Sequence, residues 1–160
     1  MNAQQIRCFL ESTENLFSTM LSSQVEFGRP ELEPRDAKHH DVSGIIAMSG
    51  DVEGTICLSF PTATAERLVC LFTGMELASD HEDFADAIGE LVNMVSGNAQ
   101  AQFEGKHVTI SCPSVVIGPE HQVYGRKDVI CIQIPCETDA GDFTVEVSIR
   151  HPAAQAAEAA

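Results

Sequence analysis

Acidic, amide and small residues recur between positions 84 and 103 at a spacing that brings them onto one side of a helix. At about 100° per residue they fall within about 80° of one another. These residues, called the polar stripe from here on, are Asp86, Glu90, Asn93, Gly97 and Gln100. No lysine or arginine lies among them. A carboxylate attracts cationic groups, and a side-chain amide both donates and accepts hydrogen bonds, so the stripe could be a functional surface. The alternative is the solvated face of an amphipathic helix.

A long helix over residues 80–103 would position this stripe. Its apolar residues fall on the opposite side: Phe84, Ile88, Leu91 and Val95, with Ala87, Val92 and Ala99 nearby. Ser79 or Asp80 is predicted to cap the helix, and Glu82 and Asp83 lie in its first turn, near the positive end of the helix dipole.

Helices and strands elsewhere indicate an α+β fold. Helical spacing predicts a helix over residues 3–21 and another from Pro61 through Leu71, ended by Gly74. Strands are predicted within 24–35, over 41–48 and 52–60 as a hairpin turning at 49–51, and over 108–117, 128–134 and 143–149. Pro135 and the loop 137–142 are expected to separate the last two strands. The last strand is predicted either to be central or to pair across a dimer edge.

Composition limits the classes of function. The 160 residues, 44% of them apolar, suit one compact domain, which we place at residues 1–152, with 153–160 as an Ala-rich and disordered tail. Nine basic against 24 acidic residues give a net charge of −15, which argues against nucleic acid and anionic membranes as partners. Because no apolar run approaches about 20 residues and no signal-peptide pattern opens the chain, we expect a cytoplasmic protein.

The cysteines and histidines carry no recognisable catalytic motif. Six cysteines lie scattered in apolar stretches without a CxxC pair, which is typical of reduced core cysteines. No arginine stands six residues after any of them, which excludes a Cys-x5-Arg phosphatase loop, and there is no Gly-rich Walker loop. His39-His40-Asp41 could be the corner of a metal site, but adjacent histidines without a spaced partner favour a polar loop, so no metal site is predicted.

Three blocks of sequence carry a resemblance to a known family. Residues 86–98, Asp-Ala-Ile-Gly-Glu-Leu-Val-Asn-Met-Val-Ser-Gly-Asn, resemble the active-site helix of the CheC/CheX/FliY phosphatases. That family signature has an acid or serine, then Glu and Asn, which Asp86, Glu90 and Asn93 match, and a later proline, which Pro113 matches slightly early. Residues 50–61 and 111–121 resemble the hairpin and the following strand of the CheX branch. The similarity covers about residues 3–150, and one Glu-x-x-Asn site per chain is the CheX arrangement.

The resemblance implies a fold, an activity and a set of roles. The fold would be a CheC/CheX-like sandwich, a largely antiparallel sheet packed against helices that include one long active-site helix. The activity would be hydrolysis of the phosphoaspartate of a CheY-like response regulator, with Asn93 orienting the attacking water and Glu90 pairing with the conserved lysine of the receiver domain. Asp86 and Gly97 would contact the partner. No cofactor of its own is expected, since the receiver would supply Mg²⁺, and CheX-like proteins are dimers.

Two other functions stay open from the sequence. The first is a non-catalytic scaffold or switch-type module that binds a phosphorylated receiver, since fold does not fix function. The second is a phosphatase acting on small phosphate esters, which would need a metal site or a nucleophile.

Overall fold

The computed structural model describes residues 3–34, 38–123 and 129–150 of the chain. In this part the helices are α1 (Ala3–Met20), α2 (Thr62–Thr73) and α3 (Glu82–Ala101). The strands are β1 (Glu26–Phe27), β2 (Glu31–Leu32), β3 (Val42–Gly50), β4 (Glu53–Phe60), β5 (Val108–Ile110), β6 (Ser114–Ile117), β7 (Cys131–Glu137) and β8 (Phe143–Arg150). All strand pairs are antiparallel, in the order β1-β7-β8-β4-β3-β5, with β2 also on β7 and β6 also on β3.

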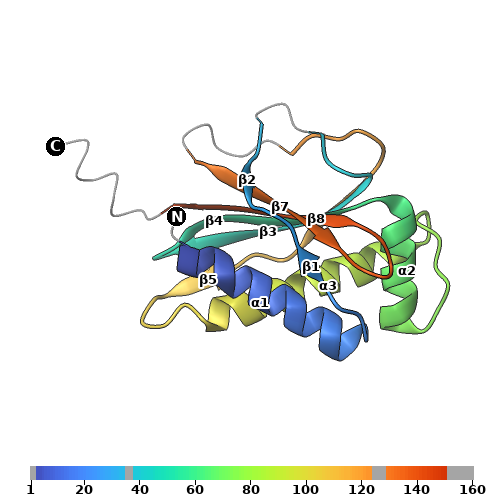
Figure 1. The fold of residues 1–160 in the computed structure, drawn as a ribbon, viewed down its shortest axis with the longest axis horizontal. Coiled ribbons are helices and arrows are strands. Elements are labelled where there is room, and N and C mark those ends of the chain that lie inside the picture. Colours follow the sequence, from blue (N-terminus) through green and yellow to red (C-terminus); the bar gives the residue numbers. More distant parts are fainter. Residues whose placement is uncertain (1–2, 35–37, 124–128, 151–160) are drawn as a thin grey trace.

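Helices α1 and α3 lie side by side along one face of the sheet, and α2 lies at one end of this layer (Figure 1). The predicted α+β class with a largely antiparallel sheet is therefore confirmed. The core forms between the helices and the sheet because alternate residues of each strand point to that face. Phe143 of β8 illustrates this packing: its ring stacks on Phe17 of α1 at 5.0 Å and on Phe60 of β4 at 5.3 Å.

The last strand, β8, is internal. It pairs with β4 on one side and with β7 on the other. The central-strand alternative is thus confirmed, and the idea that this strand pairs across a dimer edge is wrong. Its apolar sequence fits this position, because a strand buried on both faces has no solvated side.

Pro135 lies inside β7 and does not end it, which corrects the prediction. The Pro135 carbonyl accepts a hydrogen bond from the Gly28 N–H at 2.8 Å, on the side of β7 that faces away from β8. In an antiparallel pair the N–H and C=O of one residue point to the same side. The missing N–H of Pro135 therefore faces Gly28, just beyond the end of the short strand β1, and the ladder between β7 and β8 stays intact.

The segment predicted as one strand over 108–117 forms two strands, β5 and β6, both paired with β3. Between them Ser111 replaces regular pairing: its Oγ accepts from the Ala47 N–H at 3.0 Å, and its N–H donates to the Ala47 carbonyl at 2.9 Å. Pro113 cannot donate to the ladder, so the break falls before it. The expected hairpin of β3 and β4 is present, but β3 runs on to Gly50, because Ser49 and Gly50 pair with β5.

The helix ends show one success and one error of prediction. Gly74 ends α2 as expected, with φ of 73° and its N–H bonded to the Cys70 carbonyl at 2.8 Å. The cap of α3 is His81, whose Nδ1 accepts from the Asp83 N–H at 3.1 Å, and not Ser79 or Asp80. The turn closed by the His81 N–H on the Ala78 carbonyl carries those two residues before the helix begins.

Three further sequence expectations concern membrane spans, the C-terminal tail and the cysteines. No helix within the described residues is both long and apolar enough to cross a membrane. The predicted tail at 153–160, and the end of the domain at 151–152, lie outside the described residues. All six cysteines are free, and the prediction of buried cysteines is confirmed for three of them: Cys8, Cys57 and Cys136. Cys70 and Cys131 are half-buried, and Cys112 is exposed.

Candidate active site

Helix α3 presents the polar stripe outward because its apolar side packs on the sheet. Phe84, Ile88, Leu91 and Val95 are all buried. The contact is close at Gly44 of β3, where an added Cβ would lie 3.1 Å from Val92 Cγ1. A glycine in the strand thus lets the helix backbone approach, and this packing fixes which residues face outward.

The three residues of the family signature lie on this outward side. Asp86 and Glu90 are exposed, and Asn93 is half-buried. Among the described residues, none of the three side chains has a hydrogen bond or ion pair. Glu90 and Asn93 are three residues apart and therefore neighbours on the helix surface. The structure brings an acid and an amide together with their polar atoms available to a partner.

Gln100, the last member of the stripe, has a structural role. Its Nε2 donates a hydrogen bond to the Val108 carbonyl at the start of β5. It therefore ties the end of α3 to the sheet edge, and it is unavailable for the chemistry that the stripe suggests.

Pro113 lies against α3 next to this site. A Cβ added at Gly89 would lie 3.3 Å from Pro113 Cγ, so the ring packs on the helix backbone one residue before Glu90. Sequence reasoning did not single out Gly89, although a glycine inside a helical pattern often has a packing reason. Its absent side chain lets the 111–113 segment form one wall beside Glu90.

Gly97 leaves open space on the stripe. No atom lies within 4 Å of a Cβ built at this position. A side chain here would meet nothing in the chain itself, so the internal packing of the protein does not require this glycine.

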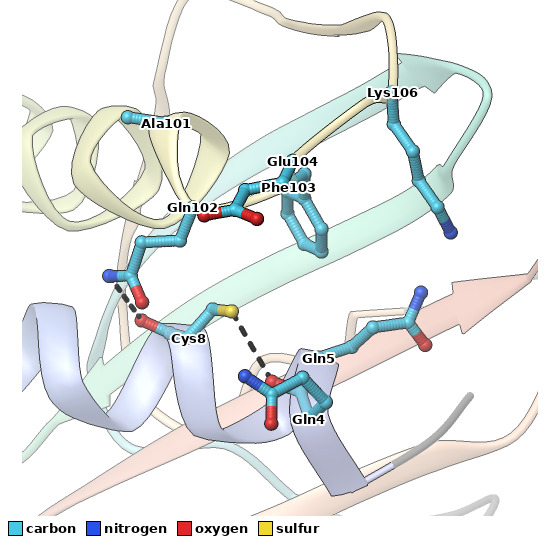
Figure 2. A pocket seen from close by; sticks show the side chains of 8 residues that line it. All are labelled: Gln4, Gln5, Cys8, Ala101, Gln102, Phe103, Glu104 and Lys106. Carbon is cyan, nitrogen blue, oxygen red and sulfur yellow. Dashed lines mark hydrogen bonds between the residues drawn. The ribbon is translucent and has the colours of Figure 1, made fainter.

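A pocket of about 540 Å³ lies at the end of α3 and the start of α1 (Figure 2). Gln4, Cys8, Gln102, Phe103 and Lys106 are among its lining residues. The Cys8 thiol donates to the Gln4 carbonyl at 3.3 Å, and burial raises the pKa of this thiol. A protonated thiol is a poor nucleophile. Gln102 is nine residues beyond Asn93, roughly 14 Å along the helix, so the pocket does not contain the signature residues.

The described residues contain one group that could hold a metal ion: His39, Cys57 and Glu146. It lies on the sheet face opposite the helices, since Cys57 and Glu146 alternate with core residues of β4 and β8. His39 lies in a loop, as predicted, but this residue is buried and not solvated.

Comparison with known proteins places these features in a family. The family model described as "Chemotaxis phosphatase CheX" matches residues 42–137. The CheY-P phosphatase CheX of Thermotoga maritima is 28% identical over 153 residues, which cover 94% of this chain and 98% of that protein.

Solved structures share the fold. The chemotaxis protein CheX of Desulfovibrio desulfuricans is 30% identical, with a TM-score of 0.84 over 92% of this chain and 99% of that one. The CheX–CheY–BeF3–Mg²⁺ complex of Borrelia burgdorferi matches with a TM-score of 0.76 at 23% identity, over 92% of this chain and 98% of that one, which shows the fold alone.

Proposed function

The chain belongs to the CheX family of chemotaxis phosphatases, and on that premise we propose that it hydrolyses the phosphoaspartate of a CheY-like response regulator. Such hydrolysis would terminate a chemotaxis or related two-component signal. The observation that carries the proposal is the pair Glu90 and Asn93, presented on one face of α3 without a partner among the described residues. The activity named for the Thermotoga maritima relative supports it.

Asn93 is proposed to orient the attacking water. An aspartyl phosphate is an acyl phosphate and already labile, so the catalyst needs chiefly to hold water in line with the phosphorus. A side-chain amide can accept a hydrogen bond from water and donate another to a phosphoryl oxygen. The half-buried position of Asn93 restricts its side chain, which lowers the entropy lost on binding.

Glu90 is proposed to fix the register of the two proteins by pairing with the conserved lysine of the receiver. The Glu90 side chain is exposed in the free chain, and binding of the receiver would remove water from it. A charge pair contributes more at a desolvated interface than at a free surface. Asp86, one turn earlier, would extend the acidic contact. The Pro113 wall beside Glu90 would limit how the receiver approaches.

The receiver is proposed to bring the metal that the reaction needs. Mg²⁺ bound beside the phosphoaspartate would neutralise charge on the phosphoryl group. The complex of the Borrelia burgdorferi relative contains CheY and Mg²⁺ together, which supports this division of labour. The reaction would then take place in the cytoplasm, where response regulators act.

The direct test is the decay of a phosphorylated CheY-type receiver from the same genome, with and without this protein. We expect faster decay at catalytic amounts of the protein. Unchanged decay with measurable binding would favour the scaffold instead. Turnover of a generic chromogenic phosphate ester would revive the small-ester alternative, for which the pocket beside Cys8 offers no activated nucleophile.

Gly97→Leu should weaken receiver binding without destabilising the helix. Because nothing lies within 4 Å of an added Cβ, and because leucine favours helices more than glycine, we expect stability to rise by about 0.5–1 kcal/mol. The side chain would project from the stripe and should weaken receiver binding by about tenfold or more. Thermal melting and receiver titration measure the two effects. Unchanged binding would mean that Gly97 faces no partner.

We also propose that the chain forms a homodimer, as the resemblance implies. The β5–β6 edge of the sheet supports this, because Val116 and Ile117 of β6 are 36% and 42% exposed. Sedimentation equilibrium should give twice the mass of one chain, and a mass of about 17.3 kDa would contradict it.

A further inference from the structure

A buried polar group lies on the side of the sheet that the phosphatase helix does not touch. The described parts of the segments before β3 and after β6, residues 38–41 and 118–123, lie on this face, opposite α1 and α3 (Figure 1). His39 lies in the first of these segments, just before β3, and Cys57 and Glu146 are paired neighbours on β4 and β8. The side chains of His39 and Glu146 are 2% and 5% exposed, and Cys57 is equally buried.

The donor atoms of this group already lie close together. One ligand atom from each of His39, Cys57 and Glu146 lies within 4.8 Å of the others, and His39 Nδ1 is 2.9 Å from Glu146 Oε1. Around a tetrahedral zinc ion with bonds of about 2.0–2.3 Å, such atoms would be roughly 3.4 Å apart. Side-chain shifts of about 1 Å would therefore bring all three into coordination.

The second ring nitrogen of His39 gives a separate indication that this group binds a metal ion. Nε2 is buried, and no hydrogen bond of ordinary geometry reaches it among the described residues, although the Glu33 carboxylate lies 3.7 Å away. Whichever tautomer is present, a buried imidazole nitrogen is left unsatisfied. A metal ion on Nδ1 would place the proton on Nε2, facing Glu33, in the carboxylate–histidine–metal arrangement that orients ligands in many proteins.

The group contains more acidic side chains than one histidine can balance. Glu33 and Glu146 face one imidazole, and Cys57 lies beside them. A proton on His39 balances one carboxylate only, whereas a divalent ion would also stabilise a thiolate.

We propose that His39, Cys57 and Glu146 bind a divalent transition-metal ion, with Zn²⁺ the best match to a nitrogen, a sulfur and a carboxylate donor. Glu33 holds His39 from outside the coordination shell. Binding releases the thiol proton of Cys57 and any second proton on the imidazole. The ion ties the segment before β3 to β4 and β8, so it stabilises the fold and takes no part in the phosphatase reaction on the opposite face.

The test measures metal binding and stability without an activity assay. The reduced full chain is stripped with a chelator, desalted and titrated with Zn²⁺ and, separately, with Co²⁺. We expect about one ion per chain, a thiolate-to-cobalt absorption band, and a rise in the thermal midpoint with Zn²⁺. Cys57→Ser and Glu146→Gln keep the side-chain size; both should bind at least about tenfold more weakly, and Cys57→Ser should lose the band.

Matched controls at exposed positions distinguish this site from surface binding. Cys112→Ser and Glu137→Gln change the same residue types outside the group and should leave uptake, band and midpoint unchanged. If the chain takes up no ion, or if Cys57→Ser and Glu146→Gln bind as the controls do, the proposal is overturned. Melting without metal shows whether each variant is folded, so a folded variant that still binds also counts against it.

Discussion

Asn93→Ala is expected to reduce the dephosphorylation of the receiver by about 100-fold while the two proteins still bind. The alanine removes the group proposed to hold the attacking water in line, and losing such positioning costs on the order of 100-fold. KM should change little, because an effect confined to kcat marks an interaction made in the transition state. Single-turnover decay of the phosphorylated receiver measures the rate, and titration of the receiver measures binding.

Asn98→Ala provides the matched control for this prediction. Asn98 is exposed on the same helix but points away from the polar stripe by about 120°. Its substitution changes the same side chain in the same secondary structure, and we expect wild-type turnover. Equal turnover of Asn93→Ala and wild type would refute the role of Asn93. Loss of turnover together with loss of binding would assign Asn93 to docking instead.

Much of the fold followed from local patterns. The periodicity of residues 3–21 and 80–103 predicted α1 and α3 nearly to their ends, and Gly74 marked the end of α2. The errors fell where tertiary pairing overrides local preference. Pro135 was expected to break a strand, but the side of β7 on which its N–H is missing is visible only once β1, β2 and β8 are in place.

The candidate site was also predicted where it depends on local spacing and missed where it depends on tertiary pairing. Helical spacing alone grouped Asp86, Glu90 and Asn93, because residues three and four apart share a helix face. The Pro113 wall depends on the break between β5 and β6 and on packing against Gly89. The His39 group requires the register of β4 on β8, which pairs Cys57 with Glu146. Partners that are 107 residues apart, such as His39 and Glu146, leave no local signal in the sequence.

Glu90→Lys should have the second largest effect, and it should act on recognition. The substitution sets a cation against the receiver lysine that Glu90 is proposed to pair with, and like charges at an interface cost several kcal/mol. We expect kcat/KM to fall by about 100-fold, equivalent to about 3 kcal/mol, chiefly through weaker binding. Stability should stay within about 0.5 kcal/mol of wild type, because Glu90 is exposed and no ion pair or hydrogen bond involves it among the described residues.

Glu76→Lys is the control that distinguishes a specific pair between Glu90 and the receiver lysine from long-range attraction by the net negative charge. Glu76 is exposed in the loop between α2 and α3. Its substitution by lysine changes the net charge of −15 by the same amount as Glu90→Lys. If the negative charge merely attracts the receiver, both variants should associate more slowly than wild type by the same factor. High salt should then bring both back to the wild-type rate. If Glu90 forms a desolvated pair, only Glu90→Lys should lose affinity, and the loss should persist at high ionic strength. Equal behaviour of the two variants would assign Glu90 to long-range attraction and leave the specific catalytic contact to Asn93.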